Sequence, residues 1–126
     1  MTDIVRLPDA SEADGALSSD VTVHSGQAFA TVIPLNTAGE LAGETIEEQS
    51  EAALLELARV LEAAGSSLDR VLHLTIYLTD IARDRAGFNE VYAAHFLGPR
   101  PVRCAVGIAA LARPGMLVEL TAIAAA

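Results

Sequence analysis

The order of apolar and polar residues predicts a long helix in the middle of this chain. From position 46 to position 64 apolar residues recur every three or four positions, as on the buried side of an amphipathic helix. Thr45 and Glu48 have the spacing of a capping box, so the helix should begin there, and Gly65 is suited to end it. The predicted buried stripe consists of Ile46, Ala53, Leu54, Leu57, Val60, Leu61 and Ala64.

A two-residue period follows this helix and predicts a strand over residues 71–78. One face of the strand should carry Leu72, Leu74, Ile76 and Leu78, and the other His73, Thr75 and Tyr77. A second helix is expected over residues 83–96, because Gly98 and Pro99 would stop it there. Its predicted buried residues are Phe88, Val91, Tyr92 and Phe96.

The segment before the first helix predicts a β-hairpin. Residues 21–24 and 28–33 are strand-like and flank Ser25-Gly26-Gln27, a polar interruption whose glycine is typical of a hairpin turn. Residues 4–7 could add a short edge strand, which Pro8 would end.

The predicted order of elements is β-β-α-β-α-β-β, an α+β fold in a single domain spanning residues 1–126. Since βαβ crossovers are right-handed, the two helices should pack together on one face of a single mixed sheet. No third layer is encoded to cover the opposite face, so a partner subunit should bury it. We expect this open face to carry Thr75, Tyr77, Ala105, Gly107 and Ile123.

The last two predicted strands, residues 102–109 and 117–124, are joined by a short turn and carry one ionisable side chain each. These are Arg103 and Glu119, and a charge in an apolar strand is costly unless it is paired or used. Arg103 shares its predicted face with small residues such as Ala105, which leaves room for a carboxylate ligand beside the guanidinium. The alternative is a structural ion pair between Arg103 and Glu119, and the pattern alone does not decide between the two.

Charge and composition exclude several classes of function. The formal net charge is −9, there is no lysine, and all eight basic residues are scattered arginines. A Schiff-base lysine and a P-loop lysine are therefore excluded, and a nucleic-acid partner is not expected because it needs a clustered basic surface. The N-terminal segment does not resemble a signal peptide and no apolar run is long enough to span a membrane, so we expect a cytoplasmic protein with no membrane partner.

Cysteine and histidine give no sign of a metal or redox centre. Cys104 is the single cysteine, which rules out an intramolecular disulfide, and in an apolar strand it should be a small core residue. His24, His73 and His95 lack the mutual spacing of a metal site. We therefore expect neither a metal nor another cofactor.

A series of motifs resembles the RidA/YjgF family. The most specific are Asn89-Glu90-Val91-Tyr92, Arg100-Pro101-Val102-Arg103-Cys104 and Val118-Glu119-Leu120, with Ile33-Pro34-Leu35 and Leu74-Thr75-Ile76-Tyr77 upstream. The resemblance covers nearly the whole chain. It implies a chorismate-mutase-like fold assembled as a homotrimer, with the sites in clefts between subunits.

The resemblance also implies an activity: cofactor-independent hydrolysis of reactive enamines and imines to a 2-keto acid and ammonia. Arg103 would hold the substrate carboxylate, Glu119 would position or activate water, and Asn89 would line the site. The backbone around Thr31 and Ala105 would complete it. These residue types suit the chemistry, because a guanidinium binds a carboxylate bidentately and a partly buried carboxylate can move a proton.

Two polar residues that the family often has at the site are missing here. The family tyrosine corresponds to Leu17, and the serine of its Ser-Gly-Gln motif falls at Ala30. The family's small thiol or hydroxyl residue corresponds to Ala105, whereas Cys104 should point to the opposite face. The pocket should be more apolar, which leaves two alternatives open: a non-catalytic trimer that binds a small carboxylate metabolite, or a diverged member with another substrate. The ribonuclease activity attached to some members is disfavoured by the net charge of −9.

Overall fold

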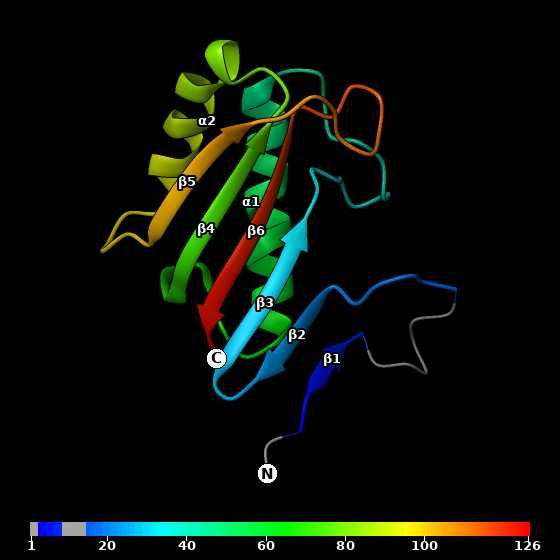
Figure 1. The fold of residues 1–126 in the computed structure, drawn as a ribbon, viewed down its shortest axis with the longest axis vertical. Helices are drawn as coiled ribbons and strands as arrows, with labels where there is room; N and C mark the ends of the chain where they lie inside the picture. The colour runs from blue at the N-terminus through cyan, green and yellow to red at the C-terminus, as the bar shows by residue number, and fades with distance from the viewer. Residues whose placement is uncertain (1–2, 9–14) are drawn as a thin grey trace.

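Six strands form one mixed sheet, and two helices cover one of its faces (Figure 1). The computed structural model describes residues 3–8 and 15–126. The strands are β1 (Val5–Leu7), β2 (Val21–His24), β3 (Gln27–Val32), β4 (Val71–Leu78), β5 (Val102–Gly107) and β6 (Val118–Ala125). The helices are α1 (Ile46–Ala63) and α2 (Ile81–His95), and the sheet order is β1-β2-β3-β6-β4-β5. The predicted α+β class, with both helices on one face, is confirmed.

The two closing strands are not neighbours in this sheet. β6 lies between β3 and β4 and is antiparallel to both, whereas β5 pairs in parallel with the other side of β4. The predicted short turn between them is therefore wrong: residues 108–117 pass across the end of β4, where the Ile108 amide donates to the Leu78 carbonyl and the Thr79 amide to the Leu117 carbonyl. The reason is the βαβ crossover through α2, which brings β5 back parallel to β4.

Helix α1 has the ends that its sequence predicts. Thr45 accepts a hydrogen bond from the Glu48 amide, and the Glu48 carboxylate accepts one from the Thr45 amide, which completes the capping box. Buried Gln49 joins two loops: its side chain donates to the Gly43 and Gly115 carbonyls and accepts from the Leu117 amide. The buried residues of the stripe are Ile46, Ala53, Leu54, Leu57, Val60 and Leu61, as predicted, and Ala64 is half-buried.

Helix α2 begins earlier than predicted. Asp80 is its N-cap and accepts a hydrogen bond from the Arg83 amide, so the first turn starts at Ile81 rather than at Arg83. Phe88 and Tyr92 are buried as predicted, Phe96 is buried just beyond the helix, and Val91 is half-buried.

The hairpin between β2 and β3 and the short edge strand β1 are confirmed. Ser25 and Gly26 both have positive φ angles, 51° and 78°, which gives a two-residue turn with the twist that a hairpin needs. β1 pairs with β2 in an antiparallel arrangement.

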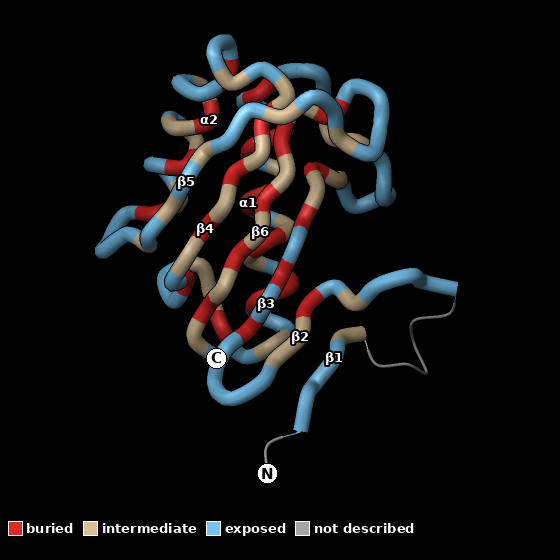
Figure 2. The backbone as a smooth tube through the Cα atoms, in the orientation of Figure 1, coloured by how far each residue is buried: buried red, intermediate tan, exposed pale blue. Residues whose placement is uncertain are grey.

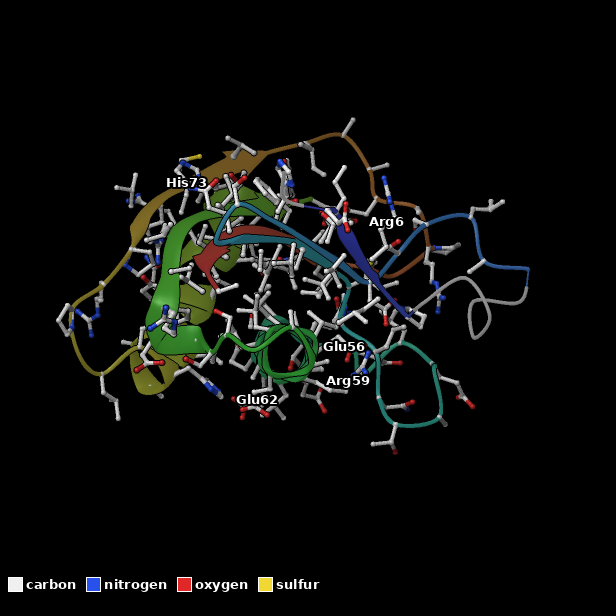
Figure 3. All side chains as sticks on the ribbon, turned by 90° about the horizontal axis from the view of Figure 1, so that it is seen from below. Arg6, Glu56, Arg59, Glu62 and His73 are labelled. Carbon is white, nitrogen blue, oxygen red and sulfur yellow. The ribbon has the colours of Figure 1, made fainter. Side chains whose placement is uncertain are left out.

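The sheet face opposite the helices is open, as predicted, but its residues are only partly those expected. Figure 3 shows Arg6 and His73 on the side of the sheet away from α1, whereas Glu56, Arg59 and Glu62 lie beside or below α1 on the helix side. The cross-strand register places Thr75, Tyr77 and Ile123 on this open face, which confirms them. Buried positions alternate with open-face positions along the central strands (Figure 2).

Ala105 and Gly107 lie on the helix-covered face, so their predicted place on the open face is wrong. They pair with Ile76 and Leu78, which are fully buried beneath the helices, and a Cβ added to Gly107 would lie 2.9 Å from Ile81 of α2. The prediction that Leu72 shares the buried face with Leu74, Ile76 and Leu78 is also wrong. A register shift between Val71 and His73 leaves Leu72 46% exposed.

Candidate functional site

Arg103 projects from edge strand β5 onto the helix-covered face, where α2 fixes its orientation. Its guanidinium carbon lies 4.5 Å from the centre of the Tyr92 ring and 5.7 Å from that of Phe88. Its Nη2 atom donates a hydrogen bond of 2.6 Å to Asn89 Oδ1. Among the described residues no carboxylate forms an ion pair with it. The charge is therefore held in place but not neutralised.

The sequence of α2 explains this arrangement. Tyr92 follows Phe88 by four residues and Asn89 by three, so its side chain adjoins both of theirs on the helix surface. The pairing of Arg103 with Leu74, a core residue, turns the arginine toward that surface. Two aromatic faces attract the cation, and the amide oxygen sets the plane of the guanidinium.

Beside Arg103 lies a hollow of about 500 Å³. Its lining consists of Ile81, Ala82, Arg85, Arg103, Cys104 and Ala105. The two alanines leave space next to the guanidinium, which is what an anchored arginine needs in order to receive a small carboxylate.

Glu119 lies on the opposite side of the sheet. It is on β6, directly across from Tyr77 of β4, and it is half-buried on the open face. Burial raises the pKa of its carboxyl group above the ordinary value of 4.5. A carboxyl group with a raised pKa holds its proton more readily and can exchange it with a nearby water.

Thr31 belongs to the same open face as Glu119. It pairs with Thr121 across β3 and β6, and their hydroxyl oxygens are 3.1 Å apart. The register continues this row to Thr75 of β4 and Cys104 of β5. Cys104 is exposed here, so its expected place in the core of the chain is wrong.

Arg103 and Glu119 do not meet within one chain. They occupy opposite faces, and β4 separates their strands, so the two positions are about 10 Å apart across the sheet before its thickness is added. The structural ion pair that the sequence left open is therefore wrong. One chain brings Arg103, Asn89 and Ala105 together on one face, and Glu119 with Thr31 on the other.

Leu17 and Ala30, which the resemblance places at the positions of the family's tyrosine and serine, contribute no hydroxyl group. Leu17 is fully exposed, and Ala30 is buried on the helix side of β3. Two residues of this region were not predicted from the sequence: Tyr92 as the support for the Arg103 guanidinium, and Arg85 as a neighbour of the hollow. Arg85 lies four residues before Asn89, and this helical spacing is the signal that could have found it.

Residues 3–8 and 15–126 contain no group of three or more His, Cys, Asp or Glu side chains placed to hold a metal ion. In the same part of the chain, no helix combines the length and the apolar character needed to cross a membrane.

The arrangement of helices, strands and motif residues has counterparts in known proteins. The family model described as Endoribonuclease L-PSP matches residues 8–126. The chain belongs to this family, the YjgF/RidA family. A RutC family protein of Pyrococcus horikoshii is 34% identical over 125 residues, which cover 98% of each chain. The mouse 2-iminobutanoate/2-iminopropanoate deaminase is 38% identical over 88 residues, which cover 70% of this chain and 64% of the mouse protein.

Solved structures of the YjgF/RidA family share the fold. A YjgF family member from Neisseria meningitidis superimposes with a TM-score of 0.83 at 31% identity, over 98% of this chain and 94% of that chain. The family resemblance of the sequence and its chorismate-mutase-like fold are both confirmed.

Proposed function

We propose that this protein hydrolyses reactive enamines and imines derived from amino acids, giving a 2-keto acid and ammonia without a cofactor. The observation that carries the proposal is Arg103: its guanidinium is oriented by Asn89 and Tyr92, is neutralised by no described carboxylate, and borders a hollow lined by small residues. The similarity to the mouse imine deaminase supports the same chemistry.

In this proposal Arg103 binds the substrate carboxylate. A guanidinium offers two parallel N–H donors to the two carboxylate oxygens, which fixes both the position and the plane of the substrate. Asn89 occupies one donor of the guanidinium, so the remaining donors are available to the ligand. The imine carbon, one bond from the carboxylate, is then held at a defined place.

Glu119 moves the proton in the proposed reaction. Its carboxylate takes a proton from water while the water oxygen bonds to the imine carbon, and it passes this proton to the imine nitrogen to give a neutral carbinolamine. Glu119 then takes the proton of the carbinolamine hydroxyl group and delivers it to the nitrogen, so that the C–N bond breaks, ammonia leaves and the C=O bond of the 2-keto acid forms. Burial shifts the pKa of Glu119 upward, which is the direction that favours this role, because general acid–base groups work best with a pKa near the operating pH.

A complete site in this proposal requires two subunits. Because Arg103 and Glu119 lie on opposite faces of one chain, the hollow at β5 of one subunit must face the open sheet face of the next. Head-to-tail contacts form a ring when the rotation between subunits closes, and we propose that they close here into the homotrimer that the resemblance implies. The open face bears exposed apolar side chains that a neighbour would cover, including Phe29, Val102 and Val106.

A second candidate function is binding without turnover. The specific observation in its favour is that Leu17 and Ala30, which the resemblance places at the family's tyrosine and serine positions, carry no hydroxyl group. In that case Arg103 would still hold a small carboxylate metabolite, and the hydroxyl groups of Thr31 and Thr121 would lie on the same open face as Glu119, two residues along β6.

The test is to generate 2-aminoacrylate with a serine dehydratase and to follow its disappearance with and without the protein. We expect acceleration by the wild type and its loss in Arg103→Ala. Arg59→Ala is the matched control, because Arg59 lies on the side of α1 away from α2, paired with Asp20 and Glu56 (Figure 3). No acceleration with this or several other amino-acid-derived imines would contradict the deaminase proposal. A carboxylate that raises Tm through Arg103 without turnover would support the binding function instead.

A further inference from the structure

The hollow beside Arg103 contains a second arginine, Arg85 of α2, that the proposed mechanism does not use. The remaining lining residues are Ile81, Ala82, Cys104 and Ala105. None of the lining residues is acidic. Two guanidinium groups therefore border one small hollow, and no acidic side chain that lines the hollow neutralises them.

Arg85 is not paired with a carboxylate among the described residues, whereas Arg83, two positions earlier, is. Arg83 binds Asp84 through two hydrogen bonds of 2.8 Å and lies near Asp80 as well. Arg85 is exposed and forms no ion pair or side-chain hydrogen bond with any residue in the described part of the chain. The chain has seventeen acidic residues and eight arginines, so a shortage of carboxylates does not explain this.

The position of Arg85 on the helix places it next to the anchored guanidinium. Arg85 precedes Asn89 by four residues, so the two side chains are neighbours on the helix surface, and Asn89 is the residue that holds Arg103. Like charges side by side repel each other, and a bound anion relieves that repulsion. Ala82 and Ala105 leave the space in which such an anion can lie.

We propose that Arg85 binds a second acidic group of the substrate, so that the preferred substrates are imines and enamines with a side-chain carboxylate. This inference rests on the proposed function, because it assumes that Arg103 binds the first carboxylate. A dianion would use both guanidinium groups, whereas a monoanion would use Arg103 alone. Arg85 is exposed, so its contribution is moderate: we expect a preference on the order of ten-fold in kcat/KM.

The experiment compares two imines made in place by an amino-acid oxidase, 2-iminoglutarate from glutamate and 2-iminopropanoate from alanine, with semicarbazide as the trap. The wild type should prefer 2-iminoglutarate, and Arg85→Ala should lower the ratio of the two kcat/KM values about ten-fold. Arg85→Lys, which keeps the charge but not the fork, should retain part of the ratio. Arg59→Ala, which removes an arginine on the far side of α1, should leave the ratio unchanged. A ratio that Arg85→Ala does not change would overturn the inference, and so would a wild type without preference.

A binding measurement separates this inference from the proposed function. The unreactive products 2-ketoglutarate and pyruvate are titrated calorimetrically into the wild type and Arg85→Ala. Selective binding of 2-ketoglutarate that depends on Arg85, without turnover of either imine, would support the inference while contradicting the proposed function. Equal binding of the two acids by the wild type would overturn the inference even if both imines are hydrolysed.

Discussion

The two faces of the sheet differ in how firmly they hold their candidate site residues. On the helix-covered face Arg103 is held by three residues of α2, so its position is determined within one chain. On the open face Glu119 lies among residues of neighbouring strands, with no described side chain bonded to its carboxylate. One chain therefore fixes the orientation of Arg103, the proposed carboxylate anchor, whereas Glu119, the proposed proton carrier, has no side-chain partner among the described residues of that chain.

The largest expected effect is on catalytic activity, for a substitution of Glu119 on the open face. Glu119→Gln removes the group proposed to move the proton while keeping its size, so kcat should fall by about 10²–10⁴-fold. Binding of a 2-keto acid at Arg103 should remain, as measured by calorimetry. If kcat stays within a few-fold of the wild type, Glu119 has no part in proton transfer.

A pair of neighbouring residues on β4 tests the two faces as sources of stability. Ile76 is fully buried on the helix side, so Ile76→Ala should lower the free energy of unfolding by about 2–5 kcal/mol. Thr75 points to the open face, and Thr75→Ala should cost less than about 1 kcal/mol in the isolated chain. Urea unfolding at low protein concentration measures both. Similar losses of unfolding free energy in the two variants would mean that Thr75 is buried and that this face of the sheet is not exposed in the isolated chain.

The pH dependence of stability reports on Glu119 specifically. Because burial raises its pKa in the folded chain above 4.5, the folded state binds the proton more tightly than the unfolded state. Stability contributed by this group is therefore highest below pH 4.5 and is lost as pH rises through the raised pKa.

Glu119→Gln should remove this dependence. The difference in unfolding free energy between Glu119→Gln and the wild type should grow in favour of the variant as pH rises above 4.5 and then level off. Thermal unfolding of both proteins across the acidic range measures it, and the other carboxyl groups cancel in the difference. A difference that does not change with pH would show that Glu119 is not buried as described.

The smallest expected effect is on Tm, for removal of the Tyr92 hydroxyl group on the helix-covered face. Its hydroxyl is buried without a hydrogen-bond partner among the described residues, whereas its ring supports Arg103. Tyr92→Phe keeps the ring and removes the unpartnered group, so Tm should be unchanged or slightly higher and activity retained. Tyr92→Leu is the contrasting variant and should weaken carboxylate binding. A marked loss of Tm in Tyr92→Phe would mean that the hydroxyl is satisfied after all.

Local signals were sufficient to predict the helices and the sheet class. The capping box at Thr45 and the spacing of buried residues located α1, and the hairpin turn at Ser25-Gly26-Gln27 followed from its glycine. These features depend on neighbouring residues only, so they can be recognised without the rest of the fold.

The side of the sheet to which β5 points could not be predicted in this way. Its apolar residues Val102 and Val106 are exposed on the open face, and its arginine turns toward the helices. This reverses the usual pattern, because aromatic rings of α2 accept the guanidinium and because, in the proposed oligomer, a neighbouring subunit covers the open face. Only the register with β4 shows which way the side chains of β5 point. The sequence pattern therefore left open an ion pair between Arg103 and Glu119 within one chain, which the structure excludes.

The central claim is that a complete site combines Arg103 of one subunit with Glu119 of another. It is tested most directly by refolding Arg103→Ala and Glu119→Gln chains together in equal amounts. Each variant alone should be inactive, and the mixture should regain about one quarter of the wild-type deaminase activity, because a quarter of the interfaces pair the two intact residues. Mixed oligomers that form, as shown by native mass spectrometry, yet remain inactive would contradict the claim.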